Sequence, residues 1–177
     1  MNAAKSIVLV GMMGAGKSSV GRCLQRRTGL ARLDTDEMLA AEFGIPIPQI
    51  FEKHGEEKFR DAETEVLRKL APDRPAIIVT GGGIVLRPAN VDLLKALGTV
   101  VWLSADEATL FERASRRNDR PLLQKENPGA VFSKLFSERE PLYTAAAQLR
   151  VDTTAKTHDE VAEAILNELE EFTALQQ

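Results

Sequence analysis

Cysteine is nearly absent from this chain, because Cys23 is the only one in 177 residues. No disulfide can form within the chain, and this is typical of proteins that work in a reducing cytoplasm. Histidine is almost as rare, and His54 and His158 have no partners at the spacing of a metal site. The sequence therefore excludes a disulfide-stapled domain and assigns neither histidine to a metal.

Long apolar runs and a strong net charge are also missing. No stretch is apolar for long enough to cross a membrane, and the first residues leave no room for a signal peptide before an expected strand. A net charge of −3 offers no general attraction for nucleic acid. We therefore expect one cytoplasmic domain over residues 1–177, with neither nucleic acid nor a membrane as partner.

Short apolar runs alternate regularly with helical patterns along the chain. Buried strands are expected at residues 7–10, 30–34, 76–79, 99–103 and 149–151, and the last helix should begin at a capping box of Thr157 and Glu160. Short apolar strands separated by helices indicate an α/β fold whose parallel sheet is covered on both faces. Ligands of such sheets bind beyond the carboxyl ends of the strands.

Residues 11–18 read Gly-Met-Met-Gly-Ala-Gly-Lys-Ser and fit the phosphate-binding loop G-x-x-x-x-G-K-[ST]. Gly14 and Gly16 let the backbone amides, with that of Ala15 between them, approach phosphate oxygens, and the following helix directs its positive end at the same anion. Lys17 should reach the β- and γ-phosphates, and the Ser18 hydroxyl should ligate Mg²⁺. The chain is predicted to bind a nucleoside triphosphate.

Two carboxylates, Asp34 and Asp36, stand where the second expected strand leaves the sheet. One can hold Mg²⁺, directly or through water, because this ion takes few protein carboxylates. The other can accept the proton of a substrate hydroxyl that attacks the γ-phosphoryl group. An aspartate that caps the next helix is the alternative, and it explains one of the two residues but not both.

The residues alone leave two possible roles open for a group of glycines and for two arginines elsewhere in the chain. Gly81, Gly82 and Gly83 follow the third expected strand and form either a close approach to a ligand or a loose turn. Arg60, on one helix face with Glu63, and Arg139, near the end of a later helix, bind a ligand or are solvated surface charges.

An arginine-rich stretch contains Arg113, Arg116, Arg117 and Arg120. It resembles a mobile flap that brings arginine to phosphate, and we expect a lid over about residues 116–127. A basic patch for nucleic acid is the alternative, which the lack of interleaved aromatic residues disfavours.

Together, in this order, the motifs resemble the shikimate kinase family over nearly the whole chain. The match covers residues 11–19, 21–22, 34–36, 47, 50–51, 55–56, 59–60, 63, 80–83, 120–123, 139 and 141–143. Phe-Arg-x-x-Glu at 59–63 and Arg-Pro-Leu-Leu at 120–123 are its most specific parts. The family transfers the γ-phosphoryl group of ATP to the 3-hydroxyl of shikimate, a step of aromatic amino-acid biosynthesis. The resemblance implies a three-layer P-loop kinase fold, with sheet order 2-3-1-4-5, helices on both faces and a mobile lid.

The resemblance also implies a role for each matching residue. Lys17 and Ser18 would serve ATP and one Mg²⁺ ion, with Ser19 beside them and Asp34 reaching the metal through water. Asp36 would bind the shikimate hydroxyls and orient the attacking one. The shikimate carboxylate would be held by Arg60 and Arg139, and the pocket completed by Gly81, Gly82 and Gly83. Arg120 would contact phosphate as the lid closes, and Arg113 would stack near adenine; Lys17, Asp36 and Arg120 are thus the expected catalytic residues.

Two rival functions remain at this point. Another small-molecule kinase, such as gluconate kinase, shares the loop but should not need Asp34, Asp36, Arg60 and Arg139 together. A nucleotide-dependent switch without chemistry is the second rival, although the chain has no Asn-Lys-x-Asp motif for guanine. The small size and the lack of an apolar surface stripe favour a monomer.

Overall fold

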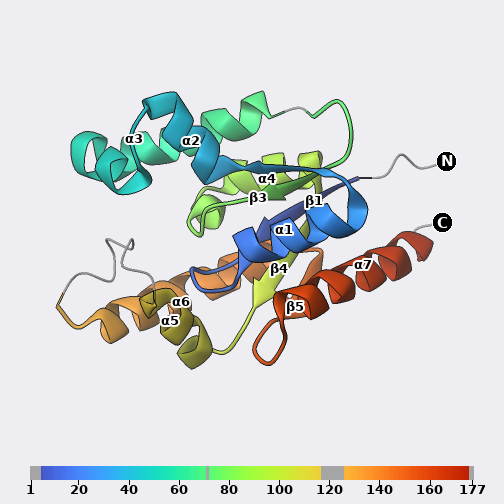
Figure 1. Cartoon of the computed structure of the whole chain (residues 1–177). Helices are drawn as coiled ribbons and strands as arrows, with labels where there is room; N and C mark the ends of the chain where they lie inside the picture. Colours follow the sequence, from blue (N-terminus) through green and yellow to red (C-terminus); the bar gives the residue numbers. More distant parts are fainter. Residues whose placement is uncertain (1–4, 71, 117–125, 176–177) are drawn as a thin grey trace.

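The computed structural model describes residues 5–70, 72–116 and 126–175, and the following description concerns these residues. Five parallel strands form one sheet in the order β2-β3-β1-β4-β5 (Figure 1). The strands are β1 (Ser6–Val10), β2 (Ala31–Asp34), β3 (Ala76–Val79), β4 (Gly98–Ser104) and β5 (Leu149–Asp152). The predicted α/β fold and its sheet order are confirmed.

Helices connect the strands and cover both faces of the sheet. They are α1 (Lys17–Thr28), α2 (Thr35–Phe43), α3 (Ile47–Lys69), the short η1 (Ile84–Leu86), α4 (Pro88–Leu97), α5 (Glu107–Ser115), α6 (Pro128–Ala146) and α7 (His158–Ala174). The chain moves one way along the sheet from β1 to β2 and the other way afterwards, so right-handed crossovers place α1 and α4 on opposite faces. α7 packs beside α1, whereas α3 and α6 lie on the face of α4.

The core lies along the central strands. Every residue of β1, β3 and β4 is buried, because helices cover the sheet from both sides. Trp102 of β4 and Cys23 of α1 are part of this core, as the apolar pattern around them predicts. None of the helices in the described ranges combines the length and the apolar character needed to cross a membrane.

Local sequence signals set most helix ends. Gly29 adopts a left-handed conformation (φ 71°) and ends α1, and Thr157 and Glu160 form the predicted capping box of α7. The sequence patterns did not predict two features of the fold. These are the short helix η1 and a break within α3 at Gly55, where φ is 78°. This break separates the start of α3 from the turn that presents Arg60.

The helices are arranged around the loop that precedes α1. In Figure 1, α2 and α3 lie at the upper left and α5 and α6 at the lower left, with this loop between them. Side chains from α2, α3 and α6 can therefore reach the same edge of the sheet as the loops after β1 and β3.

Candidate active site

The phosphate-binding loop connects β1 to α1 and depends on its glycines. Gly11, Gly14 and Gly16 have φ values of 146°, 87° and 86°, which other residues rarely adopt. A Cβ on Gly11 or Gly14 would also collide with the backbone carbonyls of Leu103 and Leu110. The loop is therefore fixed by backbone conformation and by close packing against β4 and α5.

The start of α1 has no side-chain cap, a feature that it shares with α3 and α4 but not with α2, α5, α6 and α7. Its first turn also has no acidic residue, whereas Asp34, Asp106 and Thr157 cap α2, α5 and α7. The first amides of α1 and its positive dipole end thus have no side-chain anion of their own. This is the arrangement that binds a phosphate group at a helix N-terminus.

Lys17 lies at this same point. Its Nζ donates hydrogen bonds to the carbonyl oxygens of Gly11 at 2.6 Å and Met12 at 3.1 Å. The ammonium group therefore lies across the first half of the loop, and its charge is added to that of the helix end.

A pocket of about 570 Å³ opens beside the loop, at the carboxyl ends of β1, β2 and β3. Its volume is typical of a site for a small ligand. All of the predicted acceptor and metal residues line it: Ser18, Asp34, Asp36, Arg60, Gly81, Gly82, Gly83 and Arg139. Sequence reasoning did not assign its apolar wall, which includes Met13, Ile47, Phe51 and Phe59, although all four lie at matched positions.

Asp34 and Asp36 have different surroundings. Asp34 is the N-cap of α2: its carboxylate accepts a hydrogen bond from the Asp36 amide at 3.1 Å and another from Arg32 at 3.0 Å. The capping alternative is therefore correct for Asp34, which nevertheless also lines the pocket. Asp36, one residue into α2, presents its carboxylate against Gly81, where a Cβ would lie 2.7 Å from Oδ1.

The glycine triplet is closely packed rather than loose. A Cβ on Gly81 would meet the Asp36 carboxylate, and one on Gly83 would collide with the Arg60 guanidinium. A Cβ on Gly82 would lie 3.7 Å from Nη1 of Arg139. Gly81 and Gly83 thus leave space for the charged side chains of Asp36 and Arg60, and a larger residue at either position would collide with them, whereas a Cβ at Gly82 would make only ordinary van der Waals contacts.

Arg60 is buried, so the alternative of a solvated surface charge is wrong for it. It is 8% exposed, and it donates to Glu63 at 2.6 Å and to Glu56 at 3.1 Å. The guanidinium also faces the rings of Phe51 and Phe59, at 5.8 and 5.3 Å from their centroids. These contacts fix the guanidinium at the pocket wall.

Burial and pairing act against each other in the Arg60–Glu63 pair. Burial works to lower the pKa of Arg60, but the Glu63 and Glu56 carboxylates more than offset it, and the pKa is raised. Burial raises the pKa of Glu63 above its usual range, and the Arg60 charge offsets this only in part. Arg60 therefore stays charged inside the pocket.

Arg139 on α6 is buried as well, at 5% exposure, so it is not a solvated charge either. In the described part of the chain, the Nε atoms of Arg60 and Arg139 are buried without a hydrogen-bond partner. An unpaired buried donor costs about 1–3 kcal/mol. Two guanidinium groups at one pocket are suited to a small anion, above all a carboxylate, which arginine binds with paired hydrogen bonds.

Of the remaining arginines that the sequence singled out, the structure describes Arg113 but not Arg120. Arg113 does not line the pocket: its guanidinium donates to Thr153 and to the carbonyl oxygen of Thr154, at 2.9–3.1 Å, and ties α5 to the loop after β5. Arg117 and Arg120, with most of the expected lid, lie outside the described residues. His158, which the sequence left without a role, lies near the loop, 3.2 Å from where a Cβ of Gly16 would stand.

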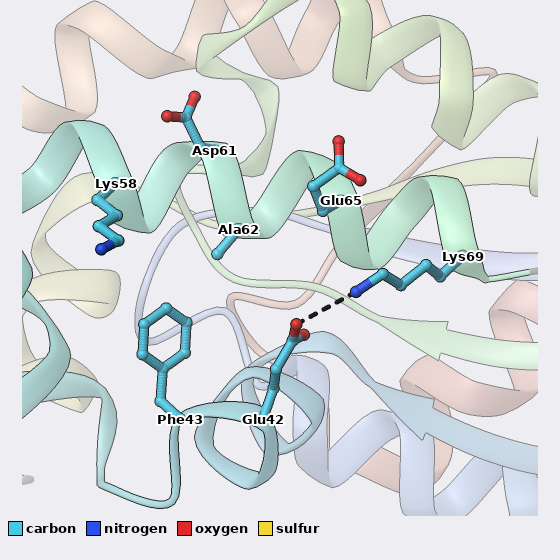
Figure 2. A pocket seen from close by; sticks show the side chains of 7 residues that line it. All are labelled: Glu42, Phe43, Lys58, Asp61, Ala62, Glu65 and Lys69. Atoms are coloured by element: carbon cyan, nitrogen blue, oxygen red, sulfur yellow. Dashed lines mark hydrogen bonds and ion pairs between the residues drawn. The ribbon is translucent and has the colours of Figure 1, made fainter.

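A second hollow, of about 420 Å³, lies between α2 and α3 (Figure 2). None of the predicted site residues lines it; its lining consists of Glu42, Phe43, Lys58, Asp61, Ala62, Glu65 and Lys69. Lys69 and Glu42 form an ion pair across it at 3.2 Å. This hollow is therefore not the candidate active site.

The donors in the main pocket fit a hydrated magnesium ion. Among the residues that the structure describes, no group of three or more His, Cys, Asp or Glu side chains could hold a metal by itself. Ser18 and Asp34 nevertheless bring two oxygen ligands to the same pocket. Mg²⁺ commonly takes one or two protein oxygens and completes its shell with water and phosphate.

Taken together, a phosphate-binding loop at the end of β1 and an arginine-lined pocket beside it define a P-loop kinase for a small acceptor. A comparison with protein families identifies which one: the family model described as shikimate kinase matches residues 13–170. This chain belongs to the shikimate kinase family and is an ATP-dependent kinase.

Individual relatives agree over nearly their full length. The shikimate kinase of Thermodesulfovibrio yellowstonii is 42% identical over 169 residues, which cover 96% of this chain and 97% of that one. A solved shikimate kinase from Acinetobacter baumannii, in complex with shikimate, superposes with a TM-score of 0.90 at 38% identity, covering 95% of this chain and 94% of that one.

A gluconokinase from Sinorhizobium meliloti matches much less well. It has a TM-score of 0.59 and 20% identity, although it covers 100% of this chain and 99% of its own. This likeness shows a shared fold alone, so it gives no support to the gluconate alternative.

Proposed function

We propose that this protein transfers the γ-phosphoryl group of ATP to the 3-hydroxyl of shikimate and releases ADP and 3-phosphoshikimate. The observation that carries the proposal is the pair of buried arginines, Arg60 and Arg139, in a pocket that also holds Asp36 and adjoins the phosphate-binding loop. A small acceptor with one carboxylate and several hydroxyls is complementary to cationic donors on one side and a carboxylate on another.

At the phosphate end, the amides of Gly14, Ala15 and Gly16 and the start of α1 would hold the triphosphate, with Ser18 and Ser19 beside it. Lys17 would leave the carbonyls of Gly11 and Met12 for the β- and γ-phosphates. Its positive charge would then stabilise the negative charge that develops on the phosphate oxygens during transfer.

At the acceptor end, Arg60 and Arg139 would hold the carboxylate, and the backbone of Gly81, Gly82 and Gly83 would close the pocket. Asp36 would accept a hydrogen bond from the attacking hydroxyl and take its proton during transfer. Positioning of the two substrates supplies most of the catalysis, because phosphoryl transfer has a loose transition state with little covalent chemistry for the protein.

One Mg²⁺ ion would be held by Ser18 and, through water, by Asp34; it would neutralise charge on the phosphate oxygens. Arg32 and the Asp36 amide keep the Asp34 carboxylate in place for this role. We also propose that Arg120 contacts phosphate as a lid closes, that Arg113 lies near adenine, and that the enzyme is a cytoplasmic monomer.

Measuring ADP release with shikimate and, separately, with gluconate tests the proposal. Turnover that requires shikimate, needs Mg²⁺ and is not supported by gluconate is expected. Turnover with gluconate in place of shikimate, or with neither acceptor, would contradict it.

A further inference from the structure

Tyr143 lies behind the wall of the pocket and has no role in the mechanism above. Its side chain is 2% exposed, and its ring stacks on Trp102 of β4 with the centroids 6.0 Å apart. Its hydroxyl donates a hydrogen bond to the carbonyl oxygen of Gly82. Because Tyr143 lies one turn after Arg139 on α6, one side chain connects that helix with the glycine triplet.

This hydrogen bond fixes a peptide plane that has no side chain of its own. The described residues contain no cis peptide bond, so the N–H of Gly83 points opposite to the carbonyl of Gly82. A donor to that carbonyl therefore sets the direction of the Gly83 amide, which glycine by itself leaves free to rotate. The space beside Gly83 belongs to the Arg60 guanidinium, so rotation here would also disturb Arg60.

The phenol is suited to remain a donor. Burial raises the pKa of Tyr143 to about 12, although the nearby Arg139 charge acts in the opposite direction. The hydroxyl thus keeps its proton at neutral pH and remains able to donate to the Gly82 carbonyl.

We propose that Tyr143 is a positioning residue for the acceptor: it holds the Gly82 carbonyl and the turn of α6 that carries Arg139, and so keeps two walls of the pocket in register. It does not line the pocket and acts only through these neighbours. This inference takes the identity of the acceptor from the proposed function, whereas the contacts of Tyr143 do not depend on that function.

The variant Tyr143→Phe tests this role, because it removes the hydroxyl and keeps the ring against Trp102. Thr144→Val is the matched control: it removes a hydroxyl from the next residue of α6, whose hydroxyl donates to the helix carbonyl of Glu140. We expect Tyr143→Phe to raise the KM for shikimate about three- to tenfold, the usual effect of one lost hydrogen bond, and to leave the KM for ATP unchanged. An equal rise in both KM values, or a shikimate KM equal to that of the control, would overturn the proposal.

A second measurement does not need turnover or a variant. Tyr143 is the only tyrosine of the chain, so tyrosinate absorbance in the near ultraviolet reports this residue alone. Suppressed ionisation at about pH 10, where free tyrosine titrates, supports the buried donor, and ordinary ionisation there overturns it. If wild type turned over no shikimate, the proposed function would fail, and this titration would still decide the contact on which the positioning role depends.

Discussion

The phosphate-binding loop draws its expected ligands from residues 11–19, whereas the acceptor pocket collects its polar groups from four separate segments, namely α2, α3, the glycine triplet and α6. The loop depends on backbone geometry, with glycines at positive φ and a helix end without a side-chain cap. The pocket depends on buried charged side chains that fill the space beside the glycines. One end of the site is thus a local structure, and the other exists only when the whole chain is folded.

This difference predicts which substrate each substitution should affect. Changes in the loop should weaken phosphate stabilisation, and changes in the pocket should affect the acceptor while ATP binding remains. A variant that affects both ends equally would show that the two regions are not separate parts.

The largest effect is expected from Asp36→Asn. The amide keeps a hydrogen-bonding shape, but it has no negative charge and is a poor acceptor for a proton. We expect kcat to fall about 10²–10⁴-fold, the usual contribution of a general base, with ATP binding largely intact. Steady-state kinetics and nucleotide titration measure the two effects. Loss of nucleotide affinity with a normal kcat at saturation would contradict the role given to Asp36.

Lys17→Ala should remove the charge that the loop directs at the transferring phosphoryl group. We expect kcat to fall about 10²-fold or more, because electrostatic contacts to developing charge commonly contribute this much. The variant loses the hydrogen bonds to the carbonyl oxygens of Gly11 and Met12, so circular dichroism should be used to check that it is folded. Near-normal kcat in a folded variant would refute the assignment of the loop.

Arg60→Ala and Arg139→Ala should each raise the KM for shikimate about tenfold to a hundredfold, and the KM for ATP far less. Charge-assisted hydrogen bonds to a carboxylate contribute about 1.5–3 kcal/mol, which gives this range. Because the two arginines would share one ligand group, the double variant should lose less than the sum of the two.

An analogue of shikimate without its carboxylate separates this effect from general damage. Wild type should bind the analogue poorly, and neither arginine variant should lose much further affinity for it. Equal losses for shikimate and the analogue would mean that the arginines support the fold of the pocket rather than hold a carboxylate.

The sequence predicts the phosphate end well because its signals are contiguous. The loop glycines, Lys17 and the strand before them lie within a dozen residues, and β3 has the predicted bounds of 76–79. Periodicity says less about Arg60 and Arg139: a charged residue beside an apolar stripe is usually solvated, and only the packing of α3, α6 and the glycine triplet buries them. The resemblance to a family indicated their importance, but not their contacts.

Tyr143 was missed as a functional residue for the same reason. It belongs to a matched motif, yet its partner Gly82 is 61 positions away in the chain, and no local pattern connects them. Likewise, the break at Gly55 depends on a positive φ that the sequence permits but does not require. Interactions that join distant segments are the part of the site that a single sequence leaves open.

The last prediction concerns stability rather than rate, and it tests the acceptor end alone. Burial raises the pKa of Tyr143 from 10.0 to about 12, so the folded protein keeps a phenol proton that the unfolded chain releases first. This group leaves the free energy of unfolding unchanged below about pH 10; as the pH rises from there towards about 12, the free energy falls by roughly 1.4 kcal/mol per unit. Urea unfolding at several pH values measures the slope, and Tyr143→Phe should lack the part that the phenol contributes. Thr144→Val should keep that part, because its hydroxyl does not titrate. If wild type and Tyr143→Phe lost stability in parallel over this range, the ionisation of Tyr143 would not be coupled to folding. The burial of the phenol at the acceptor end would then be contradicted.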